Sequence, residues 1–116
     1  MSNPVMWFEI GGKDAKKLQD FYATSFGWKI DANNPMNYGM VEAKEGIPGG
    51  VGPNPDGTPH VTFYIQVADL QKALDAVEKA GGKTVNPPFQ VPDGPELAHF
   101  TDPEGNFVGL MKPPGG

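Results

Sequence analysis

The sequence predicts an α+β protein that contains two copies of one β-α-β module. The segment His60 to Val85, HVTFYIQVADLQKALDAVEKAGGKTV, has the pattern of a strand, an Asp-capped helix, a glycine stop and a second strand. The segment Val5 to Ile30 has the same pattern. A shift of 55 positions superposes matching residues, namely Phe8 on Phe63, Asp14 on Asp69 and Gly27 on Gly82. A repeat of this size indicates a duplicated supersecondary unit.

Length, charge and composition restrict the class of protein. The chain has 116 residues, so we expect one domain over residues 1–116, with a first module at about 4–52 and a second at about 59–112. The net charge of −5 argues against nucleic acid or an anionic membrane surface as a partner. There is no cysteine, which excludes disulfides and thiolate chemistry. Because no apolar run approaches the roughly 20 residues of a membrane span, we expect a cytoplasmic protein.

The elements of the first module are predicted to be strands at residues 5–10, 28–30, 38–43 and 47–51 and a helix at residues 15–26. Alternation in the first strand places Trp7 and Glu9 on one face. Asp14 suits the N-cap of the helix, and Gly27 suits its left-handed end. The apolar stripe of this helix is predicted to be Leu18, Phe21, Tyr22 and Ser25. The last strand is broken by glycines, so we expect another group to approach its backbone closely.

The elements of the second module are predicted to be strands at residues 60–67 and 83–85, a helix at residues 70–80 and a hairpin over residues 96–111. Asp69 suits the N-cap of the helix. The stripe of this helix is predicted to be Leu70, Ala73, Leu74, Val77 and Ala80. The hairpin turn is Asp-Pro-Glu-Gly at residues 102–105, which suits a type I turn. Pairing across this turn is predicted to match Phe100 with Phe107 and Ala98 with Gly109, on the face away from the helix.

The strand at residues 60–67 has two different faces. Its apolar face, expected to meet the helix, is Val61, Phe63, Ile65 and Val67. The opposite face is aromatic and polar, like the face of the first strand that carries Trp7 and Glu9. Because aromatic side chains are unfavourable on a solvated face, we expect these faces to enclose a cavity. The predicted ligand-binding residues are Trp7, Glu9, His60, Thr62, Tyr64, Gln66, Phe100 and Phe107.

Three segments carry a family resemblance: WFEIGGKDAKKLQDFYATSFGW, HVTFYIQVADLQKALDAVEKAGGK and FTDPEGNFVGLMK. Together they cover about half of the chain, and their order resembles that of the vicinal oxygen chelate superfamily, the glyoxalase, bleomycin-resistance and extradiol dioxygenase group. The resemblance implies two tandem β-α-β-β-β modules, each with its sheet curled into a trough and its helix on the outer face. It also implies that the troughs bind a ligand or a divalent metal, and that the protein is a homodimer.

The metal ligands that the resemblance implies are missing from the matching positions. These positions hold Trp7, Thr62 and Gly109, none of which is His or Glu. Glu9 and His60 lie two residues from such positions, but two donors fall short of the three or four ligands that a bound divalent ion usually has. The sequence therefore predicts no metal ligand and no cofactor, with a divalent metal ion as the family alternative.

Several candidate site residues also have simpler structural interpretations. Glu9 and His60 are the only candidates for catalysis, as an acid–base pair. The simpler interpretation of Glu9 is a solvated carboxylate at the rim of the cavity, and that of His60 is a surface residue that begins its strand. Trp7 either stacks on a planar ligand or fills the trough. Tyr64 and Gln66 suit hydrogen bonding to a ligand more than catalysis.

Two functions of different class follow from the sequence. The first is a metal-free module that holds a small organic ligand, neutral or cationic, in the sheet cavity. The alternative is a glyoxalase-like or dioxygenase-like metal-dependent lyase, isomerase or oxygenase that uses non-standard ligands, because the fold alone does not select the chemistry.

Overall fold

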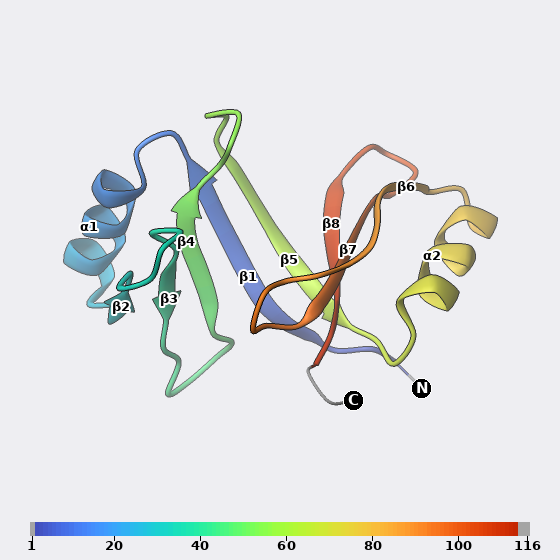
Figure 1. Ribbon diagram of the computed structural model, residues 1–116, viewed down its shortest axis with the longest axis horizontal. Coiled ribbons are helices and arrows are strands. Elements are labelled where there is room, and N and C mark those ends of the chain that lie inside the picture. The colour runs from blue at the N-terminus through green and yellow to red at the C-terminus, as the bar shows by residue number, and fades with distance from the viewer. Residues whose placement is uncertain (1, 114–116) are drawn as a thin grey trace. The chain divides into compact units, whose positions relative to one another are not determined.

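The structure, a computed structural model, describes residues 2–113 and contains two helices and eight strands (Figure 1). In chain order the elements are β1 (Val5–Gly12), α1 (Ala15–Phe26), β2 (Ile30–Asp31), β3 (Gly39–Val41), β4 (Gly49–Pro53), β5 (His60–Gln66), α2 (Leu70–Lys79), β6 (Lys83–Gln90), β7 (Glu96–Thr101) and β8 (Phe107–Lys112). The order β-α-β-β-β occurs twice. The contacts define two compact units, an N-terminal unit of residues 7–62 and a C-terminal unit of residues 2–6 and 63–113.

The N-terminal unit contains strands in the order β2-β3-β4-β1. β1 and β4 are parallel and pair Phe8 with Gly49 and Glu9 with Gly50, whereas β2 and β3 pair with their neighbours in antiparallel fashion. α1 packs against β4. β2 and β3 are shorter than predicted, and β4 begins two residues later than predicted, at Gly49.

Both ends of α1 are as predicted. The Asp14 carboxylate accepts a hydrogen bond from the Lys17 amide at 3.0 Å, and Gly27 adopts a left-handed φ of 69°. The predicted apolar stripe holds at Leu18 and Tyr22 but is wrong at Phe21, which is 55% exposed, and at Ser25, which is also exposed. Gln19 is buried instead. Gln19 is buried because its Nε2 donates to the carbonyl oxygen of Val51 on β4 at 2.8 Å, which satisfies the polar group.

The C-terminal unit contains the main apolar core. Its strands lie in the order β5-β8-β7-β6, with β5 parallel to β8, and α2 packs on β6, β7 and β8 (Figure 1). Asp69 caps α2 by accepting from the Lys72 amide at 3.0 Å. The core residues are Val67, Leu70, Leu74, Ala98, Phe100, Val108 and Leu110, with Ile65, Ala73 and Val77 packed against them. The prediction for the apolar face of β5 holds only near its C-terminal end, because Val61 and Phe63 are exposed.

The register of the β7–β8 hairpin differs by one residue from the prediction. Phe100 pairs with Val108, Thr101 pairs with Phe107, and Gly109 pairs with His99. Because alternate residues face opposite sides of a sheet, a slip of one position exchanges the two faces of a strand. The predicted placement of Phe100 on the same face as Phe107 is therefore wrong: Phe100 belongs to the core beneath α2.

The turn of this hairpin is as predicted. The amide of Gly105 donates to the Asp102 carbonyl at 2.9 Å, and Gly105 has a positive φ of 92°. The Asp102 carboxylate accepts from the side chain of Asn106 and from nearby backbone amides, which holds the pKa of Asp102 below its ordinary value. The hydrogen bonds within the turn therefore explain the presence of the Asp102 carboxylate at this position.

β6 extends farther than predicted. It continues beyond the predicted end at residue 85, through Pro87 and Pro88, to Gln90. The two prolines are tolerated because β6 is at the end of the strand order and its pairing with β7 is shifted around them. Within residues 2–113, neither helix is long and apolar enough to cross a membrane.

Candidate functional site

The carboxylate of Glu9 is the centre of a hydrogen-bonded group in the N-terminal unit. The Tyr38 hydroxyl donates to Glu9 Oε2 at 3.1 Å, and His60 Nε2 lies 3.1 Å from Glu9 Oε1. The Trp7 indole Nε1 donates to the Tyr38 oxygen at 3.1 Å. Three residues that the sequence predicted as site residues are thus brought together, with His60 in direct contact with Glu9 and Trp7 linked to Glu9 through Tyr38.

Glycines in β4 make room for Tyr38. A side chain at Gly50 would overlap the phenol end of Tyr38, and one at Gly52 would lie 2.8 Å from its ring. Because Gly50 pairs with Glu9 across the sheet, the space above this glycine is where the tyrosine hydroxyl reaches the carboxylate. The expected close approach to the glycine-broken strand is confirmed, and the approaching group is Tyr38.

Asn54 fixes the orientation of the His60 ring. Its Nδ2 donates to the carbonyl oxygen of Thr58 at 2.7 Å, which identifies this atom as the amide nitrogen. The same nitrogen lies 3.1 Å from His60 Nδ1, so Nδ1 accepts and Nε2 carries the proton that points to Glu9. Both ring nitrogens of His60 are therefore engaged, and His60 acts on Glu9 as a donor.

Tyr38 is held in its neutral form. Burial raises the pKa of Tyr38, and the nearby Glu9 carboxylate raises it further. A neutral phenol keeps the proton that it donates to Glu9. The direction of donation is thus fixed from Trp7 to Tyr38 and from Tyr38 to Glu9.

The arrangement makes Glu9 a fixed anionic acceptor. The side chains of Glu9 and His60 retain 23% and 30% exposure, so the group is accessible from solvent. A carboxylate oriented by two donors favours a ligand N–H group, an O–H group or a cation. The indole of Trp7 lies half-buried beside it and offers an apolar surface.

A second hydrogen-bonded group is centred on His99 in the C-terminal unit. Its Nε2 lies 2.8 Å from the Tyr64 hydroxyl, and its Nδ1 lies 3.0 Å from Nδ2 of Asn86. The ring of Phe107 stacks on His99 with a centroid distance of 4.9 Å, and the ring of Phe89 lies at 5.8 Å. Tyr64, predicted to bind ligand, is therefore buried with its hydroxyl at His99.

The other predicted site residues have different surroundings. Thr62 is buried. Gln66 is half-buried and pairs with Met111 where β5 runs beside β8. Phe107 is 39% exposed beside His99, whereas Phe100 lies in the core beneath α2. The predicted residues are thus divided among the two hydrogen-bonded groups, the core and two other positions on β5, Thr62 and Gln66.

Sequence reasoning missed Tyr38, Asn54 and His99. The glycines of the predicted strand at residues 47–51 indicated a close approach but not which residue makes it. Asn54 lies in a proline-rich linker that has no periodic pattern. His99 was not proposed as a site residue, because the predicted hairpin register, displaced by one residue, placed its neighbours Ala98 and Phe100 on the face away from the helix.

The residues present do not fit the family's divalent metal. Among residues 2–113, no three His, Cys, Asp or Glu side chains gather in a group that can hold a metal ion. At Gly109, one of the implied ligand positions, any side chain would overlap the ring of Tyr64. His60 Nε2 donates to Glu9 Oε1, and these two side chains are fewer than the three or four ligands that a metal centre needs.

The chain matches a known protein family over most of its length. Residues 5–110 match the Glyoxalase/Bleomycin resistance protein/Dioxygenase superfamily. The chain belongs to this superfamily. The family resemblance and the α+β fold expected from the sequence are therefore confirmed.

Two relatives of this superfamily member bear glyoxylase names. It is 30% identical over 115 residues to "Putative glyoxylase CFP32" of Mycobacterium bovis, an alignment that covers 91% of the chain and 44% of the relative. The chain thus spans less than half of the length of that relative. It is 32% identical over 124 residues to a "Glyoxylase-like domain-containing protein" of Didymella fabae, covering 96% of the chain and 94% of the relative.

The fold of this superfamily member has close counterparts among solved structures. The crystal structure of hypothetical protein BH1468 from Bacillus halodurans superposes with a TM-score of 0.73 and 16% identity, covering 97% of this chain and 95% of that one. At this identity the likeness establishes the fold and not the activity.

Proposed function

We propose that this superfamily member binds a small organic molecule without a bound metal, with Glu9 as the principal recognition group. The observation that supports it is the convergence of the Tyr38 hydroxyl and His60 Nε2 on the two carboxylate oxygens of Glu9, each at 3.1 Å. Such a carboxylate is preorganised, so a ligand does not have to order it on binding.

The ligand of this site is a hydrogen-bond donor, either neutral or cationic. Glu9 accepts, and the chain carries a net charge of −5, which disfavours anions. Trp7 supplies an apolar surface for a flat part of the ligand. Of the other predicted contacts, Thr62 belongs to the same unit as Glu9, whereas Gln66 and Phe107 belong to the C-terminal unit. Phe100 is withdrawn because it lies in the core.

A thermal-shift screen with matched variants tests the proposal. Aromatic amines, phenols and aromatic carboxylates are compared at about 1 mM, because a ligand at 100 times its Kd stabilises the folded state by about 2.7 kcal/mol. We expect amines and phenols to raise Tm by several degrees, and Glu9→Gln to weaken their affinity by about tenfold or more. Glu104→Gln, which removes the same charge from the exposed hairpin turn, should bind as the wild type does. A panel in which carboxylates bind best would refute the proposal.

The contact between Glu9 and His60 favours a second candidate function, proton transfer by Glu9. The relative from Mycobacterium bovis bears the name of a glyoxylase, so the substrate to test is the hemithioacetal of methylglyoxal and glutathione. The assay is run without metal and with nickel, zinc, manganese or iron, and bound metal is measured by mass spectrometry. Turnover that needs stoichiometric metal and is lost in Glu9→Gln or His60→Ala would establish this function and overturn metal-free binding.

A further inference from the structure

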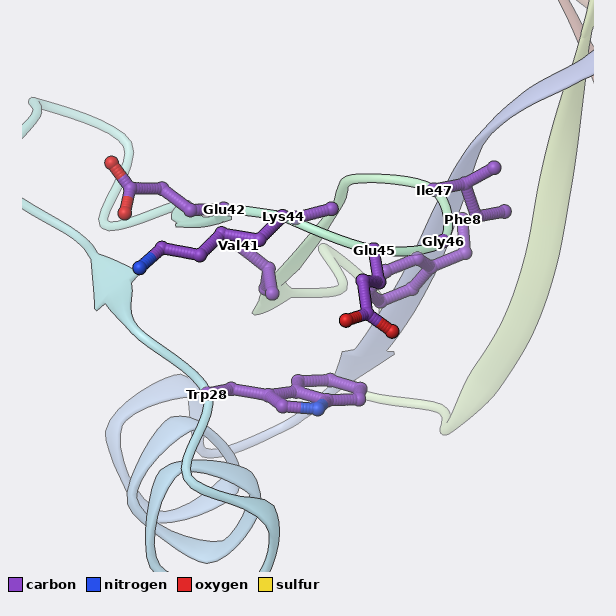
Figure 2. A pocket seen from close by; sticks show the side chains of 9 residues that line it. Phe8, Trp28, Val41, Glu42, Lys44, Glu45, Gly46 and Ile47 are labelled. Carbon is purple, nitrogen blue, oxygen red and sulfur yellow. The ribbon is translucent and has the colours of Figure 1, made fainter.

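A pocket on the opposite side of β1 from Glu9 has no part in the site described above. Its volume is about 350 Å³, within the range of small-molecule sites. It lies between the indole of Trp28 and the chain segment at residues 41–47 (Figure 2). Phe8 lines it, whereas its neighbours Trp7 and Glu9 point to the other face of the strand. The pocket lies wholly within the N-terminal unit.

Two aromatic rings form rigid walls of this pocket. The indole of Trp28 stacks on the ring of Tyr22, with centroids 5.1 Å apart and an angle of 14° between planes, so one of its faces is supported by α1. Figure 2 shows the opposite face of the indole turned toward Glu45 and Phe8. The Phe8 ring lies 5.4 Å from the indole at an angle of 54°. Two rings set at such an angle form a corner that can enclose a cation.

Backbone features hold these walls in place. Phe8 pairs with Gly49, and a side chain at Gly49 would overlap the Phe8 ring, so the ring occupies the space that this glycine leaves. Gly46 has a φ of 80°, a conformation that favours glycine and turns the segment that carries Glu45. The pocket is therefore set by the fold and not by side-chain rotamers alone.

The charges at the pocket favour a positively charged ligand. Glu45 directs its carboxylate toward the Trp28 ring, while the Lys44 side chain extends away from it (Figure 2). Glu42 adds a second carboxylate. Within the part of the chain that the structure describes, neither glutamate side chain has a hydrogen-bond or ion-pair partner. Apolar walls with unpaired carboxylates complement an organic cation.

We propose that this pocket is a second binding site, separate from Glu9, for an organic ammonium ion carried on a flat or apolar group. The ammonium lies between the Trp28 indole and the Glu45 carboxylate, and the apolar part contacts Phe8, Val41 and Ile47. The site does not depend on the function proposed for Glu9, because none of the hydrogen-bonded residues around Glu9 lines it.

Nuclear magnetic resonance of the two indole N–H groups separates the two sites. The chain has two tryptophans, Trp7 beside Glu9 and Trp28 in this pocket, and Trp28→Phe assigns their signals. Benzyltrimethylammonium is titrated into ¹⁵N-labelled protein, with benzyl alcohol and benzoate as neutral and anionic controls. We expect the cation to shift the Trp28 signal saturably, with the neutral control at least about threefold weaker and the anion weaker still.

Three glutamate variants complete the test. Glu45→Gln should weaken binding of the cation by about three- to tenfold, since it removes the facing charge and keeps the shape of the side chain. Glu9→Gln and the matched surface variant Glu104→Gln should leave the Trp28 shift unchanged. Both Glu45 and Glu104 are exposed, so these variants are expected to fold.

Several outcomes would overturn the inference. They are a shift confined to the Trp7 signal, a loss of binding in Glu9→Gln but not in Glu45→Gln, equal binding of benzyl alcohol, and the absence of a saturable shift up to about 50 mM cation. The first two would assign the cation to the Glu9 site and would support the function proposed there.

Discussion

At the scale of single residues, Tyr38 links Trp7 and Glu9, which both lie on β1, and Glu9 in turn contacts His60 on β5. Period-two alternation was enough to place Trp7 and Glu9 on one face and to select His60, because those relations are local. Tyr38 and Asn54 could not be selected in this way. Tyr38 enters the group because β3 pairs with β4, and Asn54 enters it because its amide bonds to Thr58, and neither relation leaves a periodic pattern in the sequence.

The raised pKa of Tyr38 predicts a dependence of stability on alkaline pH. A group whose pKa is raised by folding stabilises the protein fully below its unfolded value, here 10.0, and this contribution is lost as the pH rises above it. Above pH 10.0 the unfolding free energy of the wild type should fall more steeply than that of Tyr38→Phe, by up to about 1.4 kcal/mol per pH unit.

Urea unfolding between pH 8 and pH 11.5 measures this difference. Tyr22→Phe serves as the control, since it removes a tyrosine hydroxyl and leaves Tyr38 in place, and it should keep the alkaline slope of the wild type. Equal slopes for the wild type and Tyr38→Phe would show that folding does not raise the pKa of Tyr38.

The overlap between Gly50 and Tyr38 predicts a strong coupling between these positions. Gly50→Ala should destabilise the protein by about 1–3 kcal/mol, because the added methyl group displaces the phenol. In a Tyr38→Ala background the same change should cost almost nothing. Gly12→Ala on the neighbouring strand is the matched control, because its methyl group would meet Leu18 Cδ2 at an ordinary 3.4 Å. Denaturant unfolding of the double-mutant cycle measures the coupling, and additive costs would contradict it.

At the scale of elements, the sequence predicts best what is decided within a few residues. The caps Asp14, Asp69 and Gly27 and the turn at residues 102–105 all act locally, and each was predicted correctly. The β7–β8 register was wrong because two registers that differ by one residue both place apolar residues in the hairpin. The packing of α2, which buries Phe100, decides between them.

The cap of α2 predicts a measurable loss of stability. Asp69→Ala should lower the unfolding free energy by about 1 kcal/mol, because the Lys72 amide loses its acceptor at the start of the helix. Asp75→Ala, an aspartate removed from the exposed face of the same helix, is the control and should change stability by less than about 0.5 kcal/mol. Equal losses in chemical denaturation would mean that charge rather than capping is responsible.

At the scale of the whole molecule, the chain divides into two units that have different interiors. The C-terminal unit has a continuous apolar core centred on Leu74, which is 1% exposed. Both tryptophans lie in the N-terminal unit. β5 supplies residues to both units, with His60 in one and Tyr64 in the other. We therefore expect the units to unfold together.

Leu74→Ala tests this cooperativity. The cavity should cost about 2–5 kcal/mol. Tryptophan emission, which reports on the N-terminal unit, should shift to lower denaturant together with far-ultraviolet circular dichroism. Val61→Ala, at a position that is 74% exposed, should leave both curves nearly unchanged. An emission curve that stays in place while the dichroism curve moves would show that the units unfold independently.

The ring of Tyr64 over Gly109 determines how this scaffold can be re-engineered. A protein engineer who wants a metal centre here must change residues in pairs, because Gly109→His becomes sterically possible only after the ring at residue 64 has been cut back. Each intermediate with one change contains either an overlap or a void. Libraries that vary one position at a time will therefore lack variants in which Gly109→His fits without overlap. Libraries that vary residues 64 and 109 jointly will contain such variants.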